Sequence, residues 1–380
     1  MLNPFDFRLR TRLVFGPGMV EQLGHLAREL HFRRPLLVAD KGIRDAGHVD
    51  RALRLLRAAD VDPVPYHDFG VNPTTTMVEQ GRVFAEPRGI DSIIGLGGGS
   101  SLDCAKGINF LLTNGGSMQD YRGYGKVSKP MLPMIAVPTT SGTGSESQSY
   151  AVITDAESHL KIACGDPKAS FRLALLDPEL TLSLPAAVTS AAGFDAIAHA
   201  VETAVTTRRT AISTVFSHEA FRLLSSSFEC VLAAPHDLDA RGAMHLAAFY
   251  AGVAIEQSML GAAHACANPL TARYSITHGV ALAILLPHVV RWNASGQQDL
   301  YTPLVAATLN GASGGSGDEL ADRLVQIGRA AGFPDRLRDT GIPKQDLATL
   351  AEQAADQWTA AFNPVPFGRP DALEVYQCAF

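Results

Sequence analysis

Cysteine is scarce in this chain and forms no motif. The 380 residues include five cysteines, none of them in a C-x-x-C pair. The spacing excludes a cysteine-rich zinc module, and the scattered thiols favour a reducing compartment. Long hydrophobic runs are also missing. No stretch of about 18 apolar residues occurs, so no membrane span is expected.

An excess of positive charge is lacking too. The formal net charge is −6, and the sequence contains no long run of basic residues. Nucleic acid and anionic membrane are therefore excluded as expected partners. The N-terminal segment MLNPFDFRLRTRLVFGPG carries acidic and proline residues where a signal peptide needs an apolar run. From these absences we expect a cytoplasmic protein.

The sequence is long and apolar enough for a large core, since 46% of the 380 residues are hydrophobic. In the first half, short apolar runs alternate with helical patterns. The apolar runs lie at 34–40, 91–100 and 133–140, and the helical patterns at 50–59, 74–86 and 102–112. This alternation predicts a parallel sheet with helices on both faces. A polar turn inside 151–163 predicts a β-hairpin.

The second half has a different texture. From about residue 186 it is rich in alanine, helical in period and without a convincing strand. Residues 244–260 predict a buried helix, 311–320 a loop and 318–332 a surface helix. We therefore predict two domains, an α/β dinucleotide-binding domain over 1–185 and a helical metal-binding and substrate domain over 186–380.

A glycine loop follows one of the apolar runs, where Gly97, Gly98, Gly99, Ser100 and Ser101 precede a helical pattern. Glycines let a backbone approach an anion closely, and a helix N-terminus favours phosphate. The loop does not match the G-x-G-x-x-G fingerprint of a first βαβ unit. A tight turn in which a serine caps the helix explains it equally well.

A second loop follows the run at 133–140 and consists of small and hydroxyl residues from Pro138 to Ser145. Ligands of open α/β sheets bind beyond the carboxyl ends of the strands. Two such loops together indicate a ligand that contains a pyrophosphate, although a plain loop is the alternative. Asp40 ends the first run and predicts NAD rather than NADP, because a carboxylate accepts ribose hydroxyls and repels a 2′-phosphate. It could equally cap the turn that it begins.

Four polar residues in apolar, helix-prone surroundings form the most specific pattern. Asp195 and His199 are four residues apart, which places them on one face of a helix. His264 and His278 follow in similar surroundings. Three nitrogens and one carboxylate suit Fe(II) or Zn(II) and do not suit Ca(II) or Mg(II). Eight other histidines are interpreted as structural residues that do not bind the metal: His31, His48, His67, His159, His218, His236, His245 and His288.

Together these motifs resemble the iron-containing alcohol dehydrogenases over nearly the whole chain. The resemblance is carried by GGGSSLDCAK (97–106), PTTSGTGSE (138–146), GFDAIAHAVE (193–202), GAAHACANPL (261–270) and HGVALAILLPHV (278–289). It implies a Rossmann-like N-terminal domain and an all-α C-terminal domain, an architecture shared with dehydroquinate synthase. It also implies iron as the metal, with zinc as the second choice, and a homodimer or higher homo-oligomer.

The resemblance assigns roles to individual residues. The implied metal ligands are Asp195, His199, His264 and His278. The residues implied to bind NAD are Asp40, Asn72, Gly98, Gly99, Ser100, Thr139, Thr140, Thr143 and Lys161. One departure stands out, because Asn268 occupies a position where many members carry a histidine assigned to proton relay. An amide cannot relay a proton by titrating.

The predicted function is hydride transfer between a small alcohol or diol and a nicotinamide cofactor, with the metal as a Lewis acid on the alcohol oxygen. Three alternatives remain open: a hydroxyacid–oxoacid transhydrogenase, a lyase of the dehydroquinate synthase type that uses NAD without net redox, and a non-enzymatic metal- or nucleotide-binding protein. The lyase would want clustered Lys and Arg around the metal, and residues 186–290 are sparse in them. The complete metal set argues against the related maleylacetate reductases.

Overall fold

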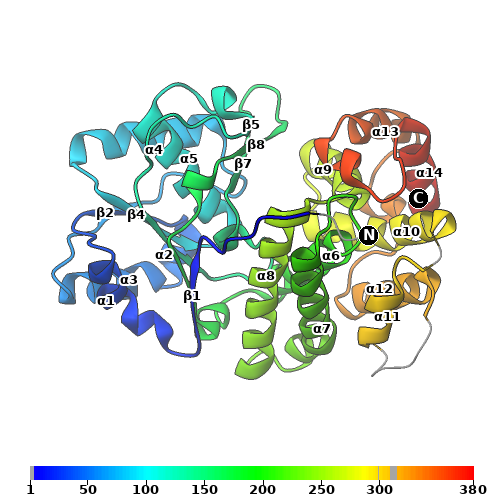
Figure 1. Cartoon of the computed structure of the whole chain (residues 1–380), viewed down its shortest axis with the longest axis horizontal. Helices are drawn as coiled ribbons and strands as arrows, with labels where there is room; N and C mark the ends of the chain where they lie inside the picture. The colour runs from blue at the N-terminus through cyan, green and yellow to red at the C-terminus, as the bar shows by residue number, and fades with distance from the viewer. Residues whose placement is uncertain (1–3, 298, 309–314) are drawn as a thin grey trace. The chain divides into compact units, whose positions relative to one another are not determined.

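The computed structural model describes residues 4–297, 299–308 and 315–380, which form two compact units (Figure 1). One unit comprises Arg8–Leu184, and the other comprises Pro185–Phe380 with the N-terminal residues up to Phe7. Of the loop predicted over 311–320, residues 311–314 lie outside the described part of the chain.

The first unit is built on a parallel sheet of six strands in the order β1-β9-β6-β4-β2-β3. The strands are β1 (Arg12–Phe15), β2 (Pro35–Val38), β3 (Val64–Tyr66), β4 (Ser92–Gly97), β6 (Met134–Pro138) and β9 (Leu173–Leu176). Every residue of β2, β4, β6 and β9 is buried, as expected of strands covered on both faces. The predicted parallel α/β architecture is confirmed.

Helices cover the two faces of this sheet. One face packs on α1 (Leu23–Glu29) and α3 (His48–Ala58), in a core that alternate residues of β2, β4, β6 and β9 also line. On the other face, α5 (Gly99–Asn114) lies directly over β4, because a Cβ on Gly95 would meet the Leu102 side chain at 2.9 Å. Helix α4 (Thr75–Ala85) packs beside α5.

This arrangement creates a topological switch point between β2 and β4. The chain leaves β2 for the short helix α2 (Lys41–Asp45) and then α3 on one face, whereas it leaves β4 for α5 on the opposite face. In open α/β sheets the crevice outside such a point binds ligands. Asp40 and the glycine loop both lie at this edge of the sheet.

A small second sheet carries the predicted hairpin. Strands β7 (Tyr150–Thr154) and β8 (Lys161–Gly165) pair in antiparallel fashion, and β5 (Gly123–Tyr124) joins β8. The hairpin register pairs Thr154 with Lys161, so Lys161 begins the strand that returns from the turn.

The described residues of the second unit form helices and connecting loops and contain no strand. Its helices are α6 (Ala186–Thr203), α7 (Ala211–Ala233), α8 (Leu238–Ser258), α9 (Ala262–Tyr274), α10 (His278–Gly296), α11 (Thr302–Thr308), α12 (Gly317–Ala330), α13 (Leu347–Ala355) and α14 (Arg369–Ala379). Figure 1 shows α6, α7 and α8 side by side, and α6 packs on both of the others and on α10. Small residues allow this: a Cβ on Gly193 would lie 2.6 Å from the ring of Phe228.

One feature of this unit differs from a simple sequence rule. Pro269 and Pro287 lie inside α9 and α10 rather than at their ends.

Among the described residues, no single helix is long and apolar enough to cross a membrane, although α8 and α9 pass that test as a pair bent by 107°. Both of these helices are largely buried inside the unit.

Candidate functional site

The four predicted metal-binding side chains converge on one atom, the Oδ1 oxygen of Asp195. The Nε2 atoms of His199, His264 and His278 lie 3.4, 3.6 and 3.9 Å from it. The rings of His199 and His264 stack at 4.7 Å between centroids, and those of His264 and His278 lie 5.3 Å apart. Residues separated by up to 83 positions in the sequence thus form one cluster.

These separations suit a shared cation better than direct hydrogen bonds. Two ligand atoms that are each about 2.1 Å from a tetrahedral metal lie about 3.4 Å apart. Asp195 Oδ1 and His264 Nε2 are both buried and have no hydrogen-bond partner. A buried polar atom without a partner is costly, and a bound cation would satisfy both atoms at once. The donor set therefore fits a divalent transition metal.

Burial of the cluster is uneven. Asp195, His199 and His264 are 7%, 5% and 3% exposed, and their ligand atoms lie within 4.8 Å of one another. The His278 side chain is 30% exposed. The cluster is therefore closed on the side of α6 and α9 and more open at the start of α10, where an exogenous oxygen could approach.

Packing between α6 and α10 fixes His278, which is the first residue of α10. The next residue, Gly279, lies so close to α6 that a Cβ there would be 1.9 Å from the carbonyl oxygen of Ala191. The other ring nitrogen of His278, Nδ1, lies 3.2 Å from Thr271 Oγ1 of α9. The ring is therefore held from two helices.

A carboxylate that we did not single out in the sequence supports His264. Glu202 is 4% exposed, and its Oε2 lies 2.5 Å from His264 Nδ1. Burial alone would lower the pKa of His264, but Glu202 and Asp195 outweigh it and raise the pKa to about 9. Burial would likewise raise the pKa of Asp195, and the three histidines instead hold it well below its usual range. The signal for Glu202 was its place three residues after His199 in an otherwise apolar helix.

The two loops of the first unit pack tightly against each other. A Cβ on Gly98 would lie 3.1 Å from Thr140 Cγ2, and one on Gly99 would lie 2.6 Å from Thr143 Cγ2. Helix α5 begins at Gly99 without a side-chain cap. The N–H groups of Ser101 and Leu102 donate to the Gly98 carbonyl, which leaves the N–H groups of Gly99 and Ser100 for an anion, with glycine leaving room for it. Thr139 Oγ1, at the end of β6, is buried without a hydrogen-bond partner.

Two further cofactor candidates join this edge. The backbone N–H of Asn72 donates to Ser100 Oγ at 3.1 Å, and Lys161 Nζ donates to Asn72 Oδ1 at 2.7 Å. Asn72 adopts a left-handed backbone with φ of 56°. Burial lowers the pKa of Lys161, and the nearby carboxylate of Asp103 opposes that shift. Asn72, Ser100 and Lys161 thus form one chain of contacts.

Asp40 has the capping role that the sequence left open. Its Oδ1 accepts the N–H of Ile43 in the first turn of α2 at 3.1 Å. Its Oδ2 accepts from Ser101 Oγ, also at 3.1 Å. These contacts tie the end of β2 to the glycine loop and leave the carboxylate at the switch point.

Two charged residues behind these loops, Lys106 and Asp103, were not predicted from the sequence. Lys106 is 0% exposed and donates to the backbone carbonyls of Ser145, Gln148 and Tyr150 at 2.6–2.9 Å. Asp103 accepts from Ser145 Oγ at 2.5 Å. Both charged residues lie in the apolar helix after the glycine loop and anchor the chain that follows the threonine loop. Their charge in an apolar helical pattern was the available signal.

Asn268 lies one turn after His264 on α9. Its Nδ2 donates to Gln357 Oε1 at 3.1 Å. Cys266, between these two positions, is buried, and burial raises the pKa of its thiol far above the usual value. Neither side chain is suited to proton transfer in this form.

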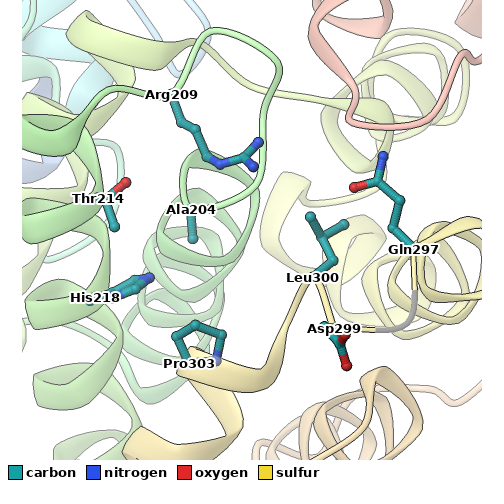
Figure 2. Close-up of a pocket in the computed structure, with 8 residues that line it drawn as sticks. All are labelled: Ala204, Arg209, Thr214, His218, Gln297, Asp299, Leu300 and Pro303. Atoms are coloured by element: carbon teal, nitrogen blue, oxygen red, sulfur yellow. The ribbon is translucent and has the colours of Figure 1, made fainter. Parts of the chain in front are cut away.

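A separate surface pocket of about 470 Å³ opens on the helical unit near the end of α6 (Figure 2). Its lining residues are Ala204, Arg209, Thr214, His218, Gln297, Asp299, Leu300 and Pro303. None of the four clustered metal-binding candidates lines this pocket, so it is distinct from the candidate metal centre.

Comparison with known families decides the identity of the chain. Residues 10–178 match the model described as iron-containing alcohol dehydrogenase, and residues 189–380 match the Fe-containing alcohol dehydrogenase family, C-terminal. The chain belongs to the iron-containing alcohol dehydrogenase family. It is accordingly an oxidoreductase of alcohols or aldehydes, which confirms the predicted enzyme class and the resemblance stated from the motifs.

Individual relatives agree with this assignment along their whole length. The chain is 32% identical to 1,3-propanediol dehydrogenase from Citrobacter freundii, covering 99% of each chain. A solved structure of a 1,3-propanediol oxidoreductase superposes with a TM-score of 0.95 at 31% identity, covering 100% of each chain. Sulfoacetaldehyde reductase from Bifidobacterium kashiwanohense, solved with NAD+, gives a TM-score of 0.88 at 26% identity, covering 99% of each chain.

Proposed function

We propose that Asp195, His199, His264 and His278 bind one divalent iron ion, and that this centre serves an NAD-dependent alcohol dehydrogenase or aldehyde reductase. The observation that carries the proposal is the convergence of three Nε2 atoms within 3.9 Å of one buried carboxylate oxygen. Iron is preferred over zinc because of the family, since the donor set suits both metals.

The unit Arg8–Leu184 is proposed to bind the cofactor. The residues assigned to it are Asp40, Asn72, Gly98, Gly99, Ser100, Thr139, Thr140, Thr143 and Lys161. The uncapped N-terminus of α5 supports a pyrophosphate position, because helix dipoles and free N–H groups favour anions. A carboxylate at Asp40 supports NAD over NADP, because it would repel a 2′-phosphate.

Different residues of the chain have different roles in the proposed reaction. When bound, the metal supplies Lewis-acid polarisation of a substrate oxygen, and nicotinamide supplies the site that gains or loses hydride. Asp195 contributes a buried negative charge that stabilises the cation. The glycine and threonine loops hold the dinucleotide in a fixed position. This lowers the entropic cost of orienting the nicotinamide toward the substrate. Asn268 holds no titrating proton, so proton transfer at that turn of α9 must use solvent or substrate hydroxyls.

We propose a small alcohol, a diol or the corresponding aldehyde as the substrate. The named relatives act on propanediol and sulfoacetaldehyde, which are both short molecules with a second polar group. The 30% exposure of the His278 side chain supports access by a small oxygen ligand. A homo-oligomeric assembly and a cytoplasmic location also stay predictions.

A substrate screen tests the proposal. Protein purified without added metal is assayed for metal content, and then for NADH formation from short alcohols and diols with NAD and NADP. We expect about one iron per chain and faster turnover with NAD. Turnover that is unchanged in rigorously metal-free protein would contradict the metal role. Hydroxyacid oxidation only in the presence of an oxoacid, without net NADH, would identify a transhydrogenase instead.

A further inference from the structure

Glu202 is a buried carboxylate whose two oxygens have different partners. Oε1 accepts the backbone N–H of Ala263 at 2.6 Å, and Oε2 lies 2.5 Å from His264 Nδ1. Ala263 and His264 lie in the first turn of α9, where backbone N–H groups have no partner within the helix. Glu202 therefore caps α9 and contacts a candidate metal ligand with the same carboxylate.

We infer that Glu202 is a positioning residue that fixes the tautomer and orientation of His264 and thereby sets the affinity of the metal centre. This inference rests on the proposed metal site. An ionised Oε2 can only accept, so His264 must carry its proton on Nδ1. In the neutral ring, which is the form that binds a metal, the lone pair of Nε2 is then free, and Nε2 lies 3.6 Å from Asp195 Oδ1. A carboxylate of this kind holds the ring at a fixed angle and makes the ligand nitrogen more basic.

A buried amide network holds the same turn of α9 from behind. Asn363 Oδ1 accepts the N–H of Ala262 at 3.3 Å, and Asn363 Nδ2 donates to Asn293 Oδ1 of α10 at 2.7 Å. Asn293 Nδ2 in turn donates to the hydroxyl of Tyr301 at 3.0 Å. The N–H groups of Ala262 and Ala263 therefore each have a side-chain acceptor, which limits the positions that Glu202 can take.

The start of α9 leaves little space for a side chain at position 261. A Cβ on Gly261 would lie 3.0 Å from Glu202 Oε1 and 3.1 Å from Asn363 Oδ1. Glycine at 261 thus lets both acceptors reach the start of α9. The carboxylate, the glycine and the amide form one compact support for a single histidine.

Glutamine at position 202 cannot reproduce this pattern. If its oxygen accepts from Ala263, its amide group donates to His264 Nδ1, and the ring proton moves to Nε2, where it blocks metal binding. If the amide flips, its N–H group faces the N–H of Ala263. Either arrangement disfavours the metal-binding form of His264.

The test compares Glu202→Gln with Glu219→Gln, a matched exchange at a surface glutamate paired with Arg222. Zn(II) affinity is measured by chelator competition, with far-UV circular dichroism of the metal-free protein and NAD affinity as controls. We expect E202Q to bind Zn(II) about 10- to 100-fold more weakly, with folding and NAD affinity retained. Wild-type affinity in E202Q would overturn the inference.

Two further measurements keep the result interpretable. Asp195→Ala tests the metal site itself: if it leaves Zn(II) affinity unchanged, the proposed site fails, whereas loss in D195A with no loss in E202Q overturns only the role of Glu202. If E202Q does not fold, ¹⁵N NMR of histidine-labelled, Zn(II)-loaded wild-type protein reports the tautomer. A proton on His264 Nδ1 supports the inference, and a proton on Nε2 overturns it.

Discussion

Gly279 touches the backbone of α6 so closely that a Cβ at this position would lie 1.9 Å from the carbonyl oxygen of Ala191. Because His278 is the adjacent residue and begins α10, this contact sets how far the fourth candidate ligand stands from Asp195. Backbone packing of two helices thus sets the position of His278, whereas a side-chain hydrogen bond with Glu202 orients His264.

Gly279→Ala should therefore destabilise the helical unit by about 3 kcal/mol or more, since an added methyl against backbone cannot be relieved by a rotamer change. It should also weaken metal binding. Thermal unfolding and metal content check both effects. Gly328→Ala is the matched control, because its Cβ would meet nothing closer than 3.8 Å. Equal melting temperatures for the two variants would show that α6 and α10 are not in close contact.

His264→Ala should abolish turnover and reduce bound metal while leaving NAD affinity close to the wild-type value. The reason is that His264 lies in the helical unit, whereas the proposed cofactor residues lie in Arg8–Leu184. Metal analysis, steady-state kinetics and NAD titration by fluorescence measure the three quantities. Retention of full metal content and activity would remove His264 from the site.

Gly99→Ala should weaken NAD binding about tenfold or more, a loss of roughly 1.4 kcal/mol. The new Cβ would lie 2.6 Å from Thr143 Cγ2 and push the two loops apart. Calorimetric titration with NAD measures the effect. The double variant with Thr143→Ala should bind close to T143A alone, because the clashing methyl is gone. Gly70→Ala, whose Cβ would meet only a methyl at 3.9 Å, serves as the control.

His245 should make the protein less stable in acid. It is 0% exposed with no hydrogen-bond partner on either ring nitrogen, and burial lowers its pKa from 6.5 to about 3. Below pH 6.5 the unfolded chain binds a proton that the folded chain does not, so stability is present above that pH and is lost as the pH falls toward 3.

His245→Leu should therefore flatten the dependence of unfolding free energy on pH in this window by up to about 1.4 kcal/mol per pH unit. Denaturant unfolding at a series of pH values measures the slope. An exchange at the exposed His236 should leave it unchanged. The account of His245 would be wrong if H245L kept the full acid dependence of the wild type.

Sequence reasoning succeeded where a local pattern has a local cause. The i, i+4 spacing of Asp195 and His199 requires only a helix to bring them together, and the glycine loop requires only a strand before a helix. The strands at 34–40, 91–100 and 133–140 and the hairpin within 151–163 were recovered for the same reason. Short strands with weak patterns, such as β3, were missed.

Contacts across long separations could not be derived in this way. Nothing in the spacing of Glu202 and His264 shows that they lie 2.5 Å apart, because the contact depends on how α6 packs against α9. Lys106 reads as one more polar residue in a helix until the carbonyls that surround it are visible. The Asp40 side chain could cap a turn or bind ribose, and only the fold shows that it does cap α2.

The central claim is that four side chains bind one metal ion, and anomalous diffraction at the iron edge from crystals of anaerobically purified protein tests it most directly. The account predicts a single strong peak within about 2.3 Å of Asp195 Oδ1 and the Nε2 atoms of His199, His264 and His278. A peak elsewhere, or none in crystals of protein that is active in the same preparation, would contradict it.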